Sequence, residues 1–311
     1  MRLCAVIVAY FLAITPLFAA EPIAALPYRI DYDGLITVKA TVNGGGPYDF
    51  VLDTGSTLTL VFETFADEMD FAPTGEAPRR VLGLVGFGAV DTYHIGDIAL
   101  GAAAITDHIG AILPDWGAPR RTPAGIIGLD FLRQYALYFD RDASMLYLYP
   151  HGGIPKNLTR NLVSVKLTPN SFGSRYDALY TVHGRLNRSR DMTFIFDLGS
   201  ASTLVNYAAA ERIYSGTVIR SLGEGLTTGS RLKDIFDDRT QAKTALIKEL
   251  RIGRVSWSNH GVWVYDSPLF DELNVQKLAY GLAGVDLILD RNFALDFGEN
   301  NLFIARRPAR G

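Results

Sequence analysis

The chain has 311 residues, of which 48% are hydrophobic and 20% are charged. This composition is that of a globular protein and excludes a disordered chain, which would be less hydrophobic and more highly charged. The net charge is −3 and no long basic run is present, so the electrostatic footprint of a nucleic-acid-binding protein is missing. The length favours two domains or two lobes.

Residues 1–20 have the pattern of a secretory signal peptide. Arg2 precedes an apolar run from Leu3 to Ile14, and the small residues Ala19 and Ala20 come before Glu21. Because Phe18 is a poor residue three places before a cut after Ala20, an uncleaved membrane anchor is the alternative. In both cases we expect an exported protein, periplasmic or secreted, with a membrane partner only if the leader is uncleaved.

The single cysteine, Cys4, lies inside this leader. The mature chain therefore has no disulfide, which favours a bacterial envelope protein over a disulfide-bonded secreted enzyme of eukaryotes. The five histidines are scattered and match no zinc motif, so we expect no metal and no cofactor.

The rest of the chain contains an internal duplication. Residues 50–56, Phe-Val-Leu-Asp-Thr-Gly-Ser, return 144 positions later as Phe-Ile-Phe-Asp-Leu-Gly-Ser at residues 194–200. This spacing holds from residues 37–61 to residues 181–205. Further along, residues 95–101 resemble 247–253, and the segments 125–130 and 136–139 resemble 281–286 and 294–297. We therefore place one lobe at 28–150 and a second at 162–305, joined by a linker at 151–161.

The predicted elements are mainly strands. In residues 36–42 the apolar side chains alternate with polar ones, which predicts a half-buried strand, and residues 43–46, Asn-Gly-Gly-Gly, predict a turn. The next strand runs into Asp53. Short helices are expected at Glu63 to Met69 and at Tyr207 to Ile213. The sequence thus predicts an all-β fold of two homologous, barrel-like lobes with a few short helices.

The repeated Asp-x-Gly-Ser motif suggests a chemistry. One copy would be weak, but a pseudo-twofold axis between two homologous lobes would bring Asp53 and Asp197 to the same point. Two ionised carboxylates about 3 Å apart would repel by roughly 5 kcal/mol at an effective dielectric near 20, so the pair should hold one proton. Such a pair offers a general base beside a general acid. Ser56 and Ser200 beside it are expected to stabilise the ionised form and favour an acidic optimum.

These motifs resemble those of aspartic peptidases of the pepsin and retropepsin type, and the resemblance covers nearly the whole mature chain. It implies a bilobal pepsin-like acid-protease fold and an aspartic endopeptidase that hydrolyses peptide or protein substrates with a water activated between Asp53 and Asp197. Residues 125–128, Gly-Ile-Ile-Gly, resemble the element that crosses behind the catalytic loop. The residues that would support the catalytic loops are Thr54, Gly55, Ser56, Gly199 and Ser200.

The Gly-rich segment 82–88 is similar to the flap that closes over a bound peptide in this family. The flap candidates are Gly83, Gly86, Phe87 and Gly88, and residues 223–229 are a candidate second flap. For both segments an ordinary flexible loop is the alternative.

One residue departs from the family pattern. Leu198 stands where the family has Thr or Ser, so one hydroxyl that ties the two loops together is missing. A non-catalytic peptide-binding envelope protein that keeps the cleft is therefore an alternative. A glycosidase is a weaker one, because its carboxyl groups lie about 5 Å or more apart. Asp130 and Asp286 also match across the repeat, and for them we expect a structural hydrogen-bonding role. We expect a monomer, since the duplication supplies both lobes in one chain.

Overall fold

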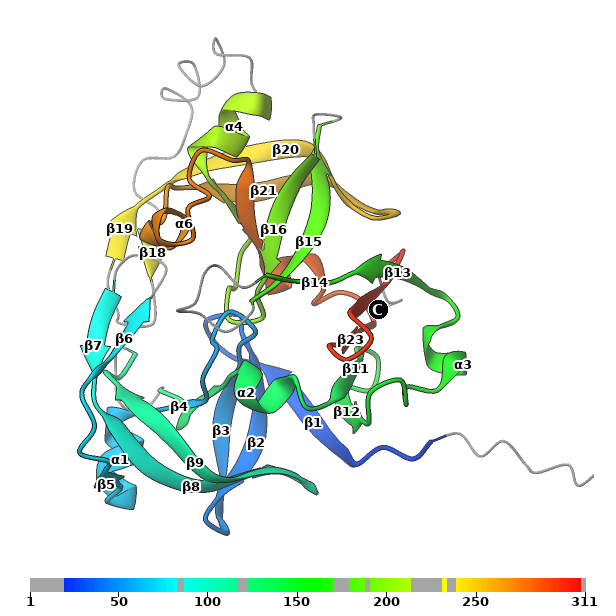
Figure 1. Ribbon diagram of the computed structural model, residues 1–311. Helices are drawn as coiled ribbons and strands as arrows, with labels where there is room; N and C mark the ends of the chain where they lie inside the picture. Colours follow the sequence, from blue (N-terminus) through cyan, green and yellow to red (C-terminus); the bar gives the residue numbers. More distant parts are fainter. Residues whose placement is uncertain are drawn as a thin grey trace, which may run out of the picture.

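The computed structural model describes residues 20–82, 87–116, 122–170, 179–187, 191–213, 231–233 and 239–308. These residues form two lobes built mainly of strands, one above the other in Figure 1. The predicted fold class, a bilobal all-β protein with a few short helices, is confirmed. Residues 1–19 of the predicted leader lie outside the described residues, and within the described ranges no helix is long and apolar enough to cross a membrane.

In the part of the N-terminal lobe that the structure describes there are twelve strands and two short helices. The predicted strand and helix both have the bounds expected from the sequence, at β2 and α1. A turn with positive φ at Asn43 (49°) and Gly44 (76°) connects β2 to β3, as expected for the Asn-Gly pair. The elements are β1 Ala24–Ile30, β2 Ile36–Val42, β3 Gly45–Leu52, β4 Leu60–Phe62, α1 Glu63–Met69, β5 Ala72–Pro73, β6 Arg79–Leu82, β7 Phe87–Val90, β8 Thr92–Leu100, β9 Ala103–Leu113, β10 Gly125–Ile127, α2 Leu129–Leu132, β11 Ala136–Asp140 and β12 Met145–Tyr149.

The C-terminal half repeats this plan, and its predicted helix is present as α4. The elements are α3 Lys156–Thr159, β13 Leu162–Lys166, β14 Thr168–Asn170, β15 Leu179–Leu186, β16 Asp191–Phe196, β17 Leu204–Val205, α4 Tyr207–Ile213, β18 Arg231–Lys233, β19 Arg239–Gln241, β20 Lys243–Ile252, β21 Val255–Val264, α6 Pro268–Glu272, β22 Tyr280–Ala283, the 3-10 helix η2 Val285–Leu287, β23 Phe293–Asp296 and β24 Asn301–Ala305.

The same three-stranded arrangement lies at the centre of each lobe. β10 is inserted between β3 and β4, parallel to β3 and antiparallel to β4. β22 is inserted in the same way between β16 and β17. These central strands are apolar throughout, because both of their faces are buried. The loops that leave β3 and β16 therefore start from equivalent positions in the two lobes.

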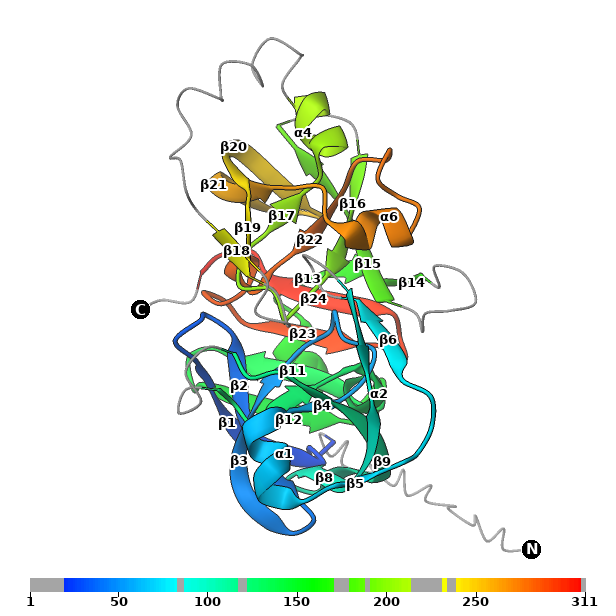
Figure 2. The ribbon, with the colours of Figure 1, turned by 90° about the vertical axis from the view of Figure 1, so that its left-hand side faces the viewer.

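The two lobes share one sheet. Part of its strand order is β13-β24-β23-β11-β12-β1. Strands of the C-terminal lobe thus lie beside strands of the N-terminal lobe, and β11 pairs antiparallel with β23. Figure 2 shows β11 and β23 between the lobes. Leu137 lies opposite Leu295, and these two residues are also equivalent in the sequence repeat. The pseudo-twofold axis therefore passes between them.

The linker predicted at 151–161 packs against the second lobe. Asp296, which is 3% exposed, accepts a hydrogen bond from Gly152 N at 2.7 Å and contacts His151 Nδ1 at 3.1 Å. The short helix α3 follows within the same stretch. The connection between the halves is thus held by a buried carboxylate.

An aromatic pair joins the lobes inside the shared sheet. The rings of Phe139 on β11 and Phe293 on β23 are stacked, with centroids 4.2 Å apart and an interplanar angle of 9°. Both side chains are fully buried. The pair places a large apolar contact at the point where the two halves meet.

We expect Phe293→Ala to lower the free energy of unfolding by about 3–5 kcal/mol, because it opens a cavity in this buried contact. Denaturant unfolding followed by tryptophan fluorescence measures the change. Leu278→Ala, at a half-exposed leucine, is the control and should cost less than about 1 kcal/mol. Equal losses in the two variants would contradict the role of the aromatic pair.

Candidate active site

Asp53 and Asp197 come together where the two lobes meet. Asp53 follows β3 and its N–H donates to Ile127 O at 3.0 Å, while Asp197 follows β16 and its N–H donates to Ala283 O at 3.0 Å. The carboxyl group of Asp197 lies against Gly55 and that of Asp53 lies against Gly199, and each carboxyl group affects the pKa of the other. The structure thus places the two aspartates of the sequence repeat at one point, as expected from a pseudo-twofold arrangement.

Glycine is required on both sides of this pair. A Cβ atom on Gly55 would lie 2.6 Å from Asp197 Oδ1, and a Cβ atom on Gly199 would overlap the carboxyl group of Asp53. Each loop therefore passes its backbone directly against the carboxyl group of the other lobe. Only a residue without a side chain allows this approach.

Backbone N–H groups lie beside both carboxyl groups. Asp53 Oδ1 accepts hydrogen bonds from Gly55 N at 2.7 Å and Ser56 N at 3.0 Å. Asp197 Oδ1 accepts one from Gly199 N at 2.8 Å, and the backbone N–H of Gly55 also lowers the pKa of Asp197. Asp53 is 7% exposed, and Asp197 is partly exposed. Backbone N–H groups thus stabilise a negative charge on both carboxyl groups.

The hydroxyl groups of Ser56 and Ser200 donate to carbonyl oxygens of their own loops and not to the carboxyl groups of the pair. Ser56 Oγ donates to Leu58 O at 2.7 Å and Ser200 Oγ donates to Ser202 O at 2.9 Å. The expectation that these serines stabilise the ionised carboxylates is therefore wrong for their side chains. The short side chains instead close local turns within their own loops, and only the backbone N–H of Ser56 reaches a carboxylate.

Both aspartates have a raised pKa. Burial raises the pKa of Asp53, and the hydrogen bonds from Asp197, Gly55 and Ser56 oppose this rise. Burial, followed by the negative charge of Asp53 and the hydrogen bond to it, raises the pKa of Asp197 well above its ordinary value. The two groups titrate as a pair, and the pair retains a proton above the pH at which an isolated aspartate would lose it.

Thr54 connects the two loops across the interface. Its buried Oγ1 donates to Phe196 O at 2.8 Å and accepts from Leu198 N at 3.0 Å. Leu198 has no hydroxyl to return the contact, and its fully buried side chain packs in the hydrophobic core. The loops are thus tied from one side only, by a single hydroxyl that makes two hydrogen bonds.

Two paired strands flank the flap candidate. β6 and β7 pair from Arg79 opposite Val90 to Leu82 opposite Phe87, and in Figure 1 they extend from the N-terminal lobe toward the other lobe. Phe87 and Gly88 belong to β7. Gly83 and Gly86, like residues 223–229 of the second candidate, lie outside the described residues.

The predicted structural role of Asp130 and Asp286 is confirmed. Asp130 accepts hydrogen bonds from Thr59, and Asp286 accepts the equivalent bonds from Thr203. Sequence reasoning missed the threonines, although they are 144 positions apart within the repeat. It also treated His108 and His260 as scattered, although both contact these clusters.

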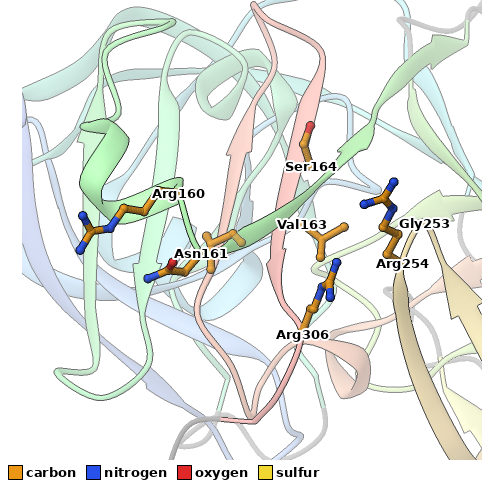
Figure 3. Close-up of a pocket in the computed structure, with 8 residues that line it drawn as sticks. Arg160, Asn161, Val163, Ser164, Gly253, Arg254 and Arg306 are labelled. Atoms are coloured by element: carbon orange, nitrogen blue, oxygen red, sulfur yellow. The ribbon is translucent and has the colours of Figure 1, made fainter.

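A hollow of about 710 Å³ lies away from the aspartate pair, beside β13 of the shared sheet. Its lining includes three exposed arginines and no acidic residue, and Figure 3 shows Arg254 and Arg306 on one side of it and Arg160 on the other. It contains neither Asp53 nor Asp197. Within the described ranges no group of three or more His, Cys, Asp or Glu residues is arranged to hold a metal ion.

A bilobal all-β protein whose pseudo-twofold axis brings two Asp-x-Gly loops together has the architecture of the aspartic peptidases. Residues 38–131, from β2 through Asp53 to α2, match the model of a family described as aspartyl protease, which supports the resemblance to aspartic peptidases. The match lies in the N-terminal lobe. No curated protein matches the chain.

We expect Thr54→Val to lower the free energy of unfolding by about 1–3 kcal/mol, because it leaves the carbonyl of Phe196 and the N–H of Leu198 buried without their partner. Denaturant unfolding measures the loss. Thr57→Val, in the same loop but partly exposed, should change stability by less than about 0.5 kcal/mol. A loss no larger than that of the control would contradict the bridging role of Thr54.

We expect Asp197→Asn to stabilise the fold as pH rises. A raised folded-state pKa gives the wild type a contribution that is fully present below the unfolded pKa, about 3.9, and is lost as pH rises through the folded pKa. The Asn side chain of the variant does not titrate, so it adds no such pH dependence to the stability. Relative to the wild type, the free energy of unfolding of the variant should therefore increase with pH, by about 1.4 kcal/mol for each unit by which the folded-state pKa is raised. Thermal unfolding from pH 4 to pH 8 measures the difference. A difference that stays constant over this range would contradict the raised pKa.

Proposed function

We propose that this chain is an aspartic endopeptidase in which Asp53 and Asp197 activate a water molecule for attack on a peptide carbonyl. The observation that carries the proposal is the close approach of the two carboxyl groups at the junction of the lobes, each against the glycine of the opposite loop, with the pKa of each raised. Paired carboxyls that share a proton supply a base and an acid at one point. The family match at residues 38–131 supports the same activity.

The reaction requires one ionised and one protonated carboxyl. The ionised group takes a proton from water as the water oxygen attacks the carbonyl carbon, and the protonated group donates its proton to the carbonyl oxygen. The tetrahedral intermediate then collapses: one of its hydroxyl groups gives its proton to the carboxylate that is ionised at this stage, the C–N bond breaks, and the amine nitrogen accepts the proton of the other carboxyl group. The pair again holds one proton. The two backbone donors to Asp53 favour the ionised form there, and the charge of Asp53 favours a proton on Asp197.

The alternative, a peptide-binding protein without catalysis, is motivated by Leu198. Positioning errors of about an ångström can cost roughly a hundredfold in rate, and Leu198 supplies no hydroxyl to hold the loops. However, Thr54 makes hydrogen bonds to both Phe196 and Leu198 and so ties the two loops by itself. This contact favours the peptidase. We further propose that the substrate is a peptide or protein met outside the cytoplasm, as the leader predicts, and that one chain suffices.

We expect Asp53→Asn and Asp197→Asn each to lower kcat by at least about 10²–10⁴-fold, because each removes one of the two proton-transfer groups. The mature protein is incubated with a mixed peptide library from pH 3 to pH 8, with and without a statine-type inhibitor, and products are identified by mass spectrometry. The rate should follow a bell-shaped profile with an acidic optimum, falling as the pair loses its shared proton.

Asp67→Asn, at an exposed position of α1, is the matched control and should leave the rate unchanged. Cleavage that persists in both variants of the pair, or a maximum above neutral pH, would overturn the mechanism. Binding of peptides without cleavage by the parent protein would support the alternative.

A further inference from the structure

His108 and His260 occupy equivalent positions in the two lobes. They are 152 residues apart, which is also the spacing between the matching segments 95–101 and 247–253. Each lies on the second strand of a long hairpin, His108 on β9 and His260 on β21. The residue before each has a positive φ, 49° at Asp107 and 51° at Asn259. The same local backbone therefore directs both imidazole rings.

In the N-terminal lobe the imidazole completes a cluster around Thr59. Asp130 Oδ2 accepts from Thr59 N at 2.9 Å, and Asp130 Oδ1 accepts from Thr59 Oγ1 at 2.7 Å. His108 Nε2 lies 2.8 Å from Thr59 O, and its Nδ1 lies 3.7 Å from Asp130 Oδ2. Since a carbonyl oxygen only accepts, Nε2 is the donor in the first contact. His108 is 6% exposed, so this is an internal contact.

The C-terminal lobe contains the equivalent cluster around Thr203. Asp286 Oδ2 accepts from Thr203 N at 2.9 Å, and Asp286 Oδ1 accepts from Thr203 Oγ1 at 2.8 Å. His260 Nε2 lies 3.0 Å from Asp286 Oδ2. Here the imidazole contacts the carboxylate directly, whereas in the other lobe it contacts the threonine carbonyl most closely.

Both clusters hold the far ends of the loops that carry the aspartate pair. Thr59 ends the loop that begins at Asp53, and its Oγ1 accepts from Gly128 N at 3.0 Å. Between these ends, Ser56 O accepts from Leu129 N at 2.9 Å. The equivalent bonds in the other lobe run from Gly284 N to Thr203 Oγ1 at 3.3 Å and from Val285 N to Ser200 O at 2.9 Å. Each loop is therefore fixed to its own lobe at both ends.

We infer that His108 and His260 are a twofold-related pair of positioning residues, each locking an Asp–Thr clamp and thereby setting the distance between Asp53 and Asp197. The inference rests on the proposed peptidase function. Because Leu198 supplies no hydroxyl across the interface, the alignment of the two loops depends more heavily on ties within each lobe. Neither imidazole needs to touch substrate for this role.

The test compares His108→Leu and His260→Leu, which remove the ring donors, with His108→Gln and His260→Gln, which keep an N–H donor. Two readouts are used: kcat and KM for a cleaved peptide, and the titration of the aspartate pair followed by ¹³C NMR of carboxyl-labelled aspartate. Spectra of Asp53→Asn and Asp197→Asn assign the two signals. His183→Leu, at an exposed histidine of β15, is the matched control.

We expect each Leu variant to lower kcat about ten- to a hundredfold with KM within about twofold, since positioning affects the transition state more than binding. The two titration steps of the pair should move closer together, because separated carboxyls interact less. The Gln variants should recover most of kcat and the wild-type titration. An unchanged kcat and titration in folded Leu variants would overturn the inference.

If a Leu variant does not fold, judged by thermal unfolding, the Gln variant is compared with the Asn variant of the same histidine, whose shorter side chain does not extend as far as Nε2. Identical titrations in that pair would also overturn the inference. If the wild type cleaves nothing, the proposed function fails, but the NMR titration still tests the positioning role. A titration that depends on His108 and His260 would support it without any turnover.

Discussion

The close approach of the carboxyl groups of Asp53 and Asp197 is the constraint on which the rest of the structure depends. Two buried carboxylates repel each other unless they share a proton, so the surrounding fold has to hold them together against this repulsion. Gly55 and Gly199 make the approach sterically possible. The central strands β10 and β22 then anchor the backbone of each aspartate to the core of its lobe.

The twofold arrangement holds the aspartate pair in place in two ways. The sheet shared by the lobes runs through the axis at Leu137 and Leu295, so a relative movement of the halves would break a continuous ladder of backbone hydrogen bonds. On the other side of each loop, Asp130 and Asp286 hold Thr59 and Thr203. The aspartate pair is thus fixed by contacts between the lobes and by contacts within each lobe.

The pseudo-twofold symmetry is not exact at the aspartate pair. Asp53 Oδ1 accepts from two N–H groups of its own loop and Asp197 Oδ1 from one of its own loop, and the negative charge of Asp53 raises the pKa of Asp197 further. Thr54 crosses the interface, while Leu198 packs in the core. These differences favour one orientation of base and acid, although the pair titrates as a unit.

The sequence by itself determined the duplicated all-β architecture, because period-2 alternation and turn residues such as Asn43 and Gly44 act through residues that are close in the chain. The repeat of the Asp-x-Gly motif located the aspartate pair. Only the tertiary structure decided which groups those residues contact. The pairing of β11 with β23, the turn-closing hydroxyls of Ser56 and Ser200, and the partners of His108 and His260 depend on the relative placement of strands. Side-chain hydrogen bonds between segments distant in the chain leave no periodic signal, because their geometry exists only once both lobes have folded.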